Sequence, residues 1–423
     1  MTTTDQNGQA PGEPSWPTAM SQDERLVVDG LLEFTRQAVV PVEDELAPLL
    51  HDPRQGFDEA GRESPRIDEA RRAVRTAAAD AGYYAMFCPP EIGGGGLGAR
   101  LAFLCWEQLH LRYGPGERLV YNTISHWASG PSAVWTKTSA RVASEVRPAV
   151  VAGRLQGCFG MSEPDAGSDA WRMKTRAERR GDTWVLNGAK QWTSFSPHAD
   201  YVLAFAVTDP ALVEARKGGI SCFYVPTATR GFAVESVIRM FGEIGGREGI
   251  LSLQDVVVPH DQLVGEPGRG FDLAMLGATQ GRLYNIARSV GLSRWALEQT
   301  ASYAKQRWAG GSPISEHQAI QFMLADMATE IYAARTMGLD CAARAQAGQD
   351  VRREAAMTKV FATNAAFQVF DRAIQVHGAM GLTNELRLHE GWKTTRAIRI
   401  ADGTDETLRR TIARELLKGN LDF

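Results

Sequence analysis

The sequence predicts an α+β protein with a helical region, a middle β region and a second helical region. Between residues 21 and 150, apolar residues recur at helical spacing and no strand-like run occurs. From 157 to 268 they form short runs rich in β-branched and aromatic residues, separated by turn signals. Helical spacing returns after Gly270. We therefore expect a disordered tail at 1–22, a helical domain at 23–156, a β domain at 157–268 and a four-helix domain at 269–423.

The first region should contain four helical stretches, at 24–50, 66–81, 101–111 and 140–151. Pro41 marks a kink or a new helix start within the first of them. Cys88–Gly98 reads CPPEIGGGGLG, and its four consecutive glycines exclude regular structure and indicate close backbone contact. The first 22 residues are polar and rich in proline and glycine, so we expect them to be disordered.

The middle region should contain several short strands, which we place at Thr183–Leu186, Tyr201–Val207, Ile220–Val225, Phe232–Val237 and Ile250–Val258. Their irregular spacing favours a compact β-barrel or sandwich. In the last region, apolar residues recur every three or four positions along 320–331, which predicts an amphipathic helix. Further helices are expected through 345 and over 352–376, in a four-helix arrangement interrupted at Gly378–Gly381.

Composition excludes several classes of protein. The 423 residues are 44% hydrophobic and carry a net charge of −4, which argues against a mainly electrostatic nucleic-acid partner. No apolar run approaches the roughly 20 residues that cross a bilayer, and the start lacks the features of a secretory signal. The five cysteines are scattered and form no CxxC pair, so reduced thiols in the cytoplasm are expected. The eight histidines show no metal-ligand spacing, and we expect no metal site.

The segment Trp392–Arg410 (WKTTRAIRIADGTDETLRR) organises the prediction of function. A basic stretch leads to Asp402 and Gly403, after which a new helix should begin with acidic residues in its first turn. Asp402 would lie at a corner between two helices, beside a glycine that lets the backbone approach a ligand closely. The alternative interpretation is that Asp402 and Thr404 only cap the new helix.

Four other motifs extend this argument, namely GMSEPDAGSD at Gly160–Asp169, KQWTS at Lys190–Ser194, RWAGGSPISEHQ at Arg307–Gln318 and QVHGAMG at Gln375–Gly381. Together with the Asp402 corner, and in this order, they resemble the acyl-CoA dehydrogenase flavoprotein family over about residues 25–420. The resemblance implies an N-terminal helical domain, a middle β domain and a C-terminal four-helix domain. It agrees with the fold predicted from the residues alone.

The resemblance implies FAD as the cofactor. It assigns contacts to Phe159, Met161, Ser162, Ser168, Trp192, Thr193, Ser194, Arg307, His317, Gln318, Gln375, His377, Gly378, Ala379, Thr404 and Glu406. An indole such as that of Trp192 offers a flat wall to the flavin ring, and a hydroxyl such as that of Ser194 can hydrogen-bond flavin N5. Taken alone, the first motif could be an ordinary turn and Trp192 a core residue of a strand. Glu163 is interpreted as structural.

Some of these contacts are expected to come from a neighbouring subunit. Arg307, His317 and Gln318 resemble the family's contacts across the subunit interface, and arginine suits a pyrophosphate. Without the resemblance, Arg307 would be read as a solvated surface residue. Gly310 stands where the family has an aromatic residue, so a stacking contact is lost or replaced by Trp308. The enzyme should be a homo-oligomer, a tetramer or a dimer.

The family's chemistry assigns Asp402 as the catalytic base, which removes the α-proton of an acyl thioester while hydride leaves the β-carbon. The alternative base position of the family, before Arg282, holds Gly281 and offers no carboxylate. The resemblance assigns substrate contacts to Ser168, Arg282 and Gly403. Most members have glutamate at the base position. Aspartate is about 1.5 Å shorter, and a misplacement of about 1 Å can cost roughly a hundredfold in rate.

Aspartate at this position resembles the branch of acyl-CoA dehydrogenase family members 10 and 11, which we favour, and also nitroalkane oxidase. The first hypothesis is an acyl-CoA dehydrogenase of lipid metabolism that passes electrons to an electron-transfer flavoprotein. The second is a nitroalkane oxidase or acyl-CoA oxidase that uses O₂. The third is a non-catalytic flavin-binding homologue. Chain length and branching of the acyl group, and whether it is carried on CoA or a carrier protein, do not follow from the sequence.

Overall fold

The computed structural model describes residues 20–116 and 118–422 of the chain. Most of the tail that was expected to be disordered therefore lies outside the described residues. Its last residues do not fit that expectation, because Ser21 caps the first helix. The Ser21 side chain accepts the Glu24 N–H and the Glu24 carboxylate accepts the Ser21 N–H, which is a capping box.

The N-terminal region is helical, as predicted. Its elements are α1 (Gln22–Phe34), the π-helical turn η1 (Thr35–Val39), α2 (Val40–Glu45), α3 (Ala47–His51), α4 (Pro53–Gly56), α5 (Pro65–Asp80), η2 (Pro90–Ile92), α6 (Ala99–Tyr113), η3 (Leu119–Asn122), η4 (Ala133–Lys137), α7 (Ala140–Glu145) and α8 (Arg147–Val151). Pro41 lies in the first turn of α2, where a missing N–H costs least. The helical stretch expected at 140–151 is present, and it divides into α7 and α8 at Val146, two residues before Pro148.

The middle region contains one mixed sheet. Its strands are β1 (Gly157–Gly160), β2 (Arg176–Arg180), β3 (Thr183–Ser194), β4 (Tyr201–Val207), β5 (Ile220–Pro226), β6 (Phe232–Ile238), β7 (Glu248–Pro259) and β8 (Leu263–Val264). The order is β6-β7-β3-β2-β4-β5-β8, with β1 parallel to β4. The short elements η5 (Ala170–Arg172), η6 (Ser196–His198), α9 (Pro210–Glu214) and η7 (His260–Gln262) lie between strands. Every residue of β4 is buried, which places this strand at the core of the domain.

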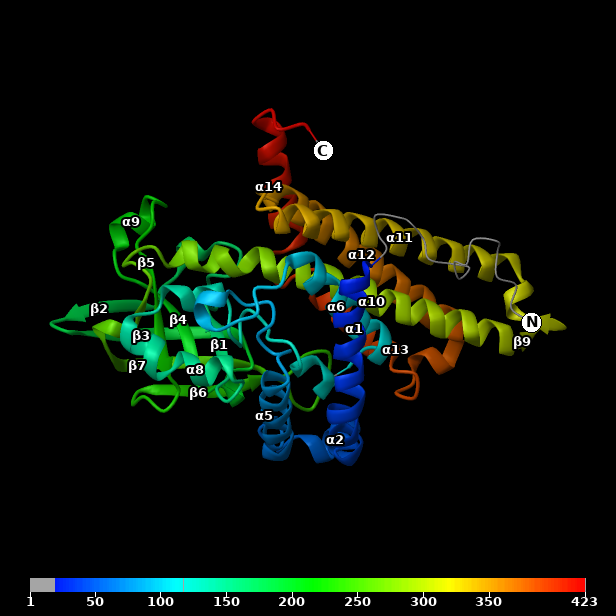
Figure 1. The fold of residues 1–423 in the computed structure, drawn as a ribbon, viewed down its shortest axis with the longest axis horizontal. Coiled ribbons are helices and arrows are strands. Elements are labelled where there is room, and N and C mark those ends of the chain that lie inside the picture. The colour runs from blue at the N-terminus through cyan, green and yellow to red at the C-terminus, as the bar shows by residue number, and fades with distance from the viewer. Residues whose placement is uncertain (1–19, 117, 423) are drawn as a thin grey trace.

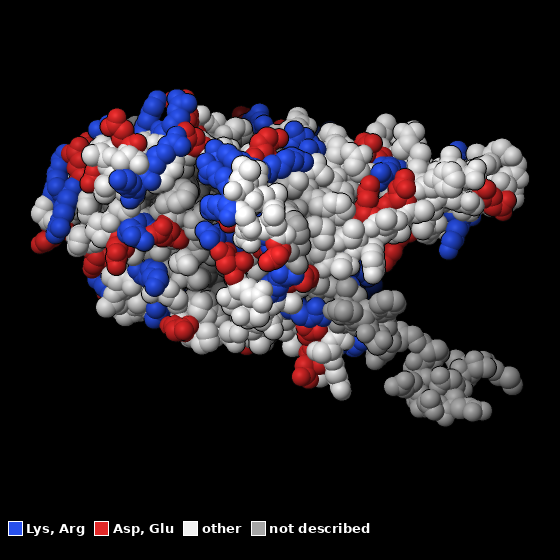
Figure 2. All heavy atoms as spheres, turned by 90° about the horizontal axis from the view of Figure 1, so that it is seen from above, with Lys and Arg blue, Asp and Glu red and all other residues white. Residues whose placement is uncertain are grey.

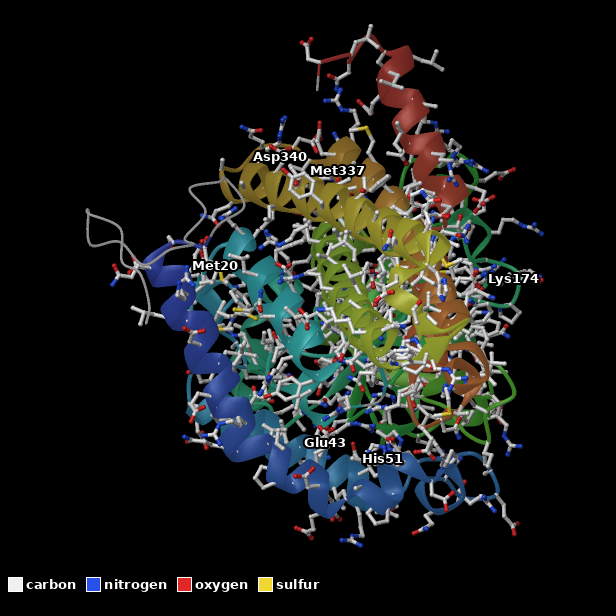
Figure 3. All side chains as sticks on the ribbon, turned by 90° about the vertical axis from the view of Figure 1, so that its right-hand side faces the viewer. Met20, Glu43, His51, Lys174, Met337 and Asp340 are labelled. Carbon is white, nitrogen blue, oxygen red and sulfur yellow. The ribbon has the colours of Figure 1, made fainter. Side chains whose placement is uncertain are left out.

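The C-terminal region is mainly helical. It contains α10 (Gly270–Gln306), the hairpin strands β9 (Trp308–Ala309) and β10 (Ser312–Pro313), η8 (Ile314–Glu316), α11 (Gln318–Gln346), α12 (Arg352–His377), η9 (Gly378–Leu382), α13 (Leu388–Ala397) and α14 (Asp405–Leu417). At about 1.5 Å per residue, α10 is about 55 Å long, and it runs from the β domain to the opposite end of the molecule (Figure 1). Seen from that end, α11 carries Met337 and Asp340 on the outside of the bundle (Figure 3).

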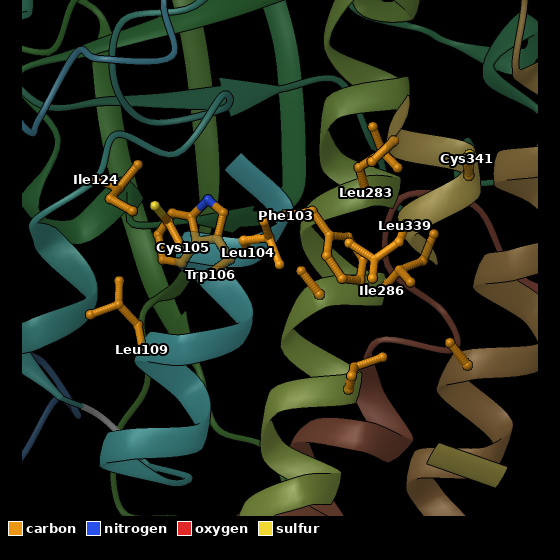
Figure 4. Packing of buried hydrophobic residues seen from close by; sticks show 14 of the residues in the cluster. Phe103, Leu104, Cys105, Trp106, Leu109, Ile124, Leu283, Ile286, Leu339 and Cys341 are labelled. Atoms are coloured by element: carbon orange, nitrogen blue, oxygen red, sulfur yellow. The ribbon is translucent and has the colours of Figure 1, made fainter. Parts of the chain in front are cut away.

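The two helical regions share one core. Buried residues of α1, α6, α10, α11 and α12 form a single hydrophobic cluster, and Figure 4 shows Phe103 of α6 beside Ile286 of α10 and Leu339 of α11. This cluster fixes α6 against the part of α10 that faces the Asp402 corner. Charges of both signs are interspersed on the face shown in Figure 2.

Candidate active site

Asp402 lies at the predicted corner between α13 and α14. Its backbone is left-handed, with φ of 53°, and Gly403 follows with φ of 102°. Such conformations are uncommon for residues other than glycine, and aspartate is among the few that tolerate them. Thr404 caps α14, because its Oγ1 accepts the Thr407 N–H at 3.2 Å. The capping interpretation therefore holds for Thr404, and the Asp402 carboxylate is left to face α10.

The Asp402 carboxylate is held by Asn285, whose Nδ2 donates to Oδ2 at 2.7 Å. Burial raises the pKa of the Asp402 carboxyl above its ordinary value, against the opposing effects of Lys359, the Asn285 hydrogen bond and Arg282. A raised pKa makes this aspartate a stronger base than one in water. Abstraction of a weakly acidic proton requires this greater basicity.

Lys359 of α12 holds the corner from behind. Its side chain is fully buried, and Nζ donates to the Ala401 carbonyl at 2.6 Å and to the Gly403 carbonyl at 2.8 Å. Burial lowers the pKa of Lys359 to about 8. The ammonium thus joins the two peptide groups on either side of Asp402. Sequence reasoning missed this residue, although a single lysine within the apolar stretch of α12 is a signal that could have found it.

Gly281 and Arg282 lie on α10 against the same carboxylate. A Cβ atom at position 281 would lie 2.9 Å from Asp402 Oδ2, so a larger residue there would displace the aspartate. Arg282 Nε is buried and has no hydrogen-bond partner among residues 20–116 and 118–422. Burial lowers the pKa of Arg282, and the nearby Asp402 opposes that effect. A partly buried guanidinium with a free Nε donor fits an anionic or carbonyl group of a ligand.

Asp405 is the other acid of the corner, and its carboxylate is already engaged. Asn364 donates to its Oδ2 at 2.8 Å and Arg399 at 3.1 Å, and the residue is 2% exposed. These contacts fix the first turn of α14 against α12. Asp405 therefore anchors the corner, whereas Asp402 is the acid that faces α10. Glu406, in the same turn, is exposed.

The first predicted flavin motif follows β1. Phe159 lies in that strand, and the Ser162 carbonyl accepts the Gln191 N–H of β3 at 2.9 Å, so Met161 and Ser162 are held beside the KQWTS motif. Glu163 accepts the backbone N–H groups of Lys174 and Thr175, and Lys190 Nζ at 2.7 Å. All of these bonds stabilise the turn, which is the structural use expected of Glu163. Ser168 lies exposed on the same loop, and Figure 3 places Lys174 at the outer edge of the molecule.

The second motif ends β3 at an irregularity of the strand pairing between Lys190 and Thr193. Trp192 has φ of 62° and its side chain is 53% exposed, so it is not the core residue of the alternative interpretation. Thr193 Oγ1 is buried without a hydrogen-bond partner in the described part of the chain. Ser194 Oγ donates to Glu248 Oε1 at 3.4 Å, a contact the sequence did not predict. An exposed indole beside an unsatisfied hydroxyl fits a flat polar-edged ring such as a flavin.

The remaining predicted FAD residues lie at the opposite end of α10. Arg307 follows that helix and His317 precedes α11, where its Nε2 contacts the Ala309 carbonyl at 2.9 Å. His377 stacks on Tyr303 with ring centroids 4.3 Å apart, which brings the QVHGAMG motif to this end as well. Figure 1 shows this end, at β9, far from β1 and β3. One chain therefore holds two separate halves of the predicted site, the second made of Arg307, His317, Gln318, Gln375, His377, Gly378 and Ala379.

The fold and the first half of the site define a flavin-dependent oxidoreductase with a raised-pKa carboxylate. Residues 158–256 match the family described as "Acyl-CoA dehydrogenase, middle domain", and residues 268–417 match "Acyl-CoA dehydrogenase, C-terminal domain". The human mitochondrial short-chain specific acyl-CoA dehydrogenase is 34% identical over 80% of this chain and 80% of its own. The chain belongs to the acyl-CoA dehydrogenase family.

Two further proteins illustrate the extent of this similarity. FadE25 of Mycobacterium tuberculosis, named as a probable acyl-CoA dehydrogenase, is 33% identical over 83% of this chain and 90% of its own. The solved butyryl-CoA dehydrogenase of Megasphaera elsdenii superimposes with a TM-score of 0.78 at 26% identity, covering 94% of this chain and 99% of that one. The chain is accordingly an oxidoreductase that acts on CH–CH bonds with FAD as cofactor. Among the described helices, none is long and apolar enough to cross a membrane.

Proposed function

We propose that this enzyme dehydrogenates an acyl-CoA thioester between Cα and Cβ, with Asp402 as the base. The observation that carries this proposal is the Asp402 carboxylate itself. It stands at a left-handed corner, faces α10, accepts one hydrogen bond from Asn285 and has a raised pKa. The Cα–H bond breaks and its proton passes to Asp402 Oδ, while the electron pair forms the Cα–Cβ double bond.

The other residues of the corner position the substrate in this proposal. Arg282, with its unsatisfied Nε, and the Gly403 N–H bind the thioester end, and Ser168 binds the outer part of the ligand. Bound FAD supplies the two-electron acceptor for the β-hydride. Trp192, Thr193 and Ser194 hold its ring, together with Phe159, Met161, Ser162, Thr404 and Glu406. The shorter reach of aspartate is met by the absence of a side chain at Gly281, which lets the carboxylate approach α10.

The aspartate supports placing this enzyme in the branch that resembles family members 10 and 11. We propose that an electron-transfer flavoprotein then takes the electrons from the reduced flavin. Two reactions of the purified enzyme test the alternative hypotheses, a nitroalkane oxidase and an acyl-CoA oxidase. Anaerobic mixing of the FAD-loaded enzyme with acyl-CoA thioesters should bleach the flavin, whereas bleaching by nitroalkanes alone would contradict the proposal. Rapid production of hydrogen peroxide in air without added acceptor would identify an oxidase.

We also propose that each FAD site is completed by a neighbouring subunit, since Arg307 and His317 lie at the other end of α10 from Trp192. Substituting Arg307→Ala should weaken FAD binding roughly 10- to 100-fold, because a charge-assisted hydrogen bond contributes about 1.5–3 kcal/mol. Titration of the apoenzyme with FAD, followed by flavin fluorescence, measures this loss.

A mixed oligomer makes the sharing of sites testable. Asp402→Asn and Arg307→Ala chains carrying different tags are co-expressed, and hetero-oligomers are purified on both tags. If sites are shared, each mixed pair regains one site with both residues intact, and acyl-CoA then bleaches tightly bound flavin. If Arg307 serves its own chain, no site in the mixture is intact, and activity no greater than that of the separate variants would contradict the proposal.

A further inference from the structure

A cavity of about 130 Å³ lies between α6, α10 and two loops of the N-terminal region. Its walls come from both helical regions, and four of its lining residues, Phe103, Trp106, Ile124 and Leu283, are labelled in Figure 4. Resting on the proposed function, we infer that this cavity receives the acyl end of the substrate and is built for an aromatic ring carried on Cβ, as in a 3-arylpropanoyl thioester.

The cavity adjoins the catalytic corner. Trp127 and Gln280 both line it, and Gln280 precedes Gly281 on α10. The Cβ position of residue 281 would lie 2.5 Å from Trp127 Nε1 and 2.9 Å from Asp402 Oδ2, so the indole edge and the carboxylate approach the same point. Trp127 also contacts Phe159 edge-on at 5.0 Å, next to the flavin motif after β1. The substrate Cβ is bonded directly to the Cα that reacts at Asp402, so a substituent on Cβ would enter this cavity past Trp127.

The size of the cavity limits the substituent. A cavity of about 150 Å³ in another protein holds one benzene molecule, so the space here matches a single six-membered ring. Its inner wall is firm, because Trp106 is 6% exposed and packs edge-on against Tyr284 at 4.7 Å. Behind this pair, the buried His110 stacks on Tyr121 at 4.2 Å. A straight chain of eight carbons could enter only by displacing Trp106.

The chemistry of the walls favours an aromatic over an aliphatic occupant. Six aromatic side chains line the cavity: Phe87, Phe103, Trp106, His126, Trp127 and Tyr284. Several already meet edge-to-face, including His126 and Tyr284 at 5.0 Å. A planar ring can continue this arrangement with its own faces and edge, and such pairs add to the effect of apolar burial. A short aliphatic group gains the burial alone.

His126 adds a polar group to this wall. The Ala128 N–H donates to its Nδ1 at 3.3 Å, which leaves the ring proton on Nε2. Burial and the charge of Arg288 lower the pKa of His126 to about 4, so the ring is neutral near pH 7. Nε2–H is then a donor on a wall that also contains the Gln280 amide. A hydroxyl group on the substrate ring would therefore find hydrogen-bond partners on this wall.

Binding of product analogues to the FAD-loaded enzyme tests the inference independently of turnover. Titration calorimetry compares cinnamoyl-CoA with trans-2-butenoyl-CoA and trans-2-octenoyl-CoA. We expect cinnamoyl-CoA to bind at least about tenfold more tightly than either, because several aromatic contacts act together. Equal or tighter binding of either aliphatic thioester would overturn the inference and leave the dehydrogenase function standing. Failure of every saturated acyl-CoA, 3-phenylpropanoyl-CoA included, to reduce the flavin would overturn the proposed function instead.

Two variants locate the ring in this cavity. Ala102→Leu narrows the cavity from α6 and should weaken cinnamoyl-CoA binding by more than it weakens binding of the smaller butenoyl-CoA, so that the preference for the aromatic thioester is lost. Ala77→Leu, at an exposed position of α5, is the matched control and should behave as wild type. Trp106→Leu removes the inner wall and should raise the affinity for octenoyl-CoA by about tenfold or more. Cinnamoyl-CoA binding that is unchanged in Ala102→Leu would place the ring elsewhere and overturn the inference.

Discussion

Substitution of Asp402 by asparagine is expected to slow flavin reduction by acyl-CoA roughly 10²- to 10⁴-fold while FAD stays bound. Asparagine keeps the size of the side chain and can still meet Asn285, but it cannot accept the α-proton. Stopped-flow mixing under anaerobic conditions measures the rate, and the flavin absorbance of the purified variant measures occupancy. Reduction at the wild-type rate would show that another group is the base.

The neighbouring acid provides the control. Asp405→Asn removes a charge from the same corner but changes a carboxylate that Asn364 and Arg399 already hold. It should lower the free energy of unfolding, seen as a lower thermal midpoint, with a much smaller loss of rate than Asp402→Asn. Asp402→Glu keeps the acid but moves it by about 1.5 Å, and a loss of roughly a hundredfold is expected. A fully active Asp402→Glu would mean that the corner is not fitted to aspartate.

The pH dependence of the wild-type rate follows from the same geometry. Asp402 acts as a base only when it is deprotonated, and burial raises its pKa. The rate of flavin reduction should therefore fall on acidification, and at a higher pH than an ordinary aspartate with pKa near 3.9 would cause. The inflection in a plot of rate against pH, with substrate at saturation, gives the pKa in the complex. An inflection at or below the ordinary value would contradict the environment described for Asp402.

The sequence predicted the order of the three regions because apolar periodicity changes clearly at their boundaries. It missed β1 and β2 because GCFG is only four residues long and RAERR is nearly all charged, so neither resembles an apolar strand. It also ended the first predicted strand at Leu186, whereas β3 continues through irregular pairing to Ser194. Such strands form because neighbouring strands pair with them, so the propensities of their own residues do not predict them.

The same limit applies to the site. Asp402 could be singled out because its corner has a local signature of Gly, Thr and acidic residues. The residues that contact the corner, Asn285 and Lys359, have no such local signature. Asn285 is 117 residues away in sequence, and Lys359 is 42 residues from the carbonyl of Ala401 that it binds. Only the packing of α10 and α12 against the corner brings them together. The separation of Arg307 from Trp192 along α10 is likewise visible only once the length and direction of that helix are known.

Lys359 provides the second large effect. In Lys359→Met the carbonyls of Ala401 and Gly403 lose their common donor, which should lower the free energy of unfolding by about 1–3 kcal/mol. The corner then relaxes, and a shift of the Asp402 carboxylate by about 1 Å would slow flavin reduction roughly a hundredfold. Denaturant unfolding and stopped-flow reduction measure the two losses. Lys418→Met, at a largely exposed position just after α14, is the matched control and should change neither.

The pH profile separates this role from simple loss of stability. The positive charge of Lys359 lowers the pKa of Asp402 and so opposes the effect of burial. Because the pKa of Lys359 is about 8, that charge is present throughout the range in which a carboxyl titrates. Removing it must raise the pKa of Asp402 further, so the acidic limb of the rate profile should move to higher pH in Lys359→Met. A variant that is destabilised but keeps the wild-type limb would show that Lys359 supports the corner without tuning the base.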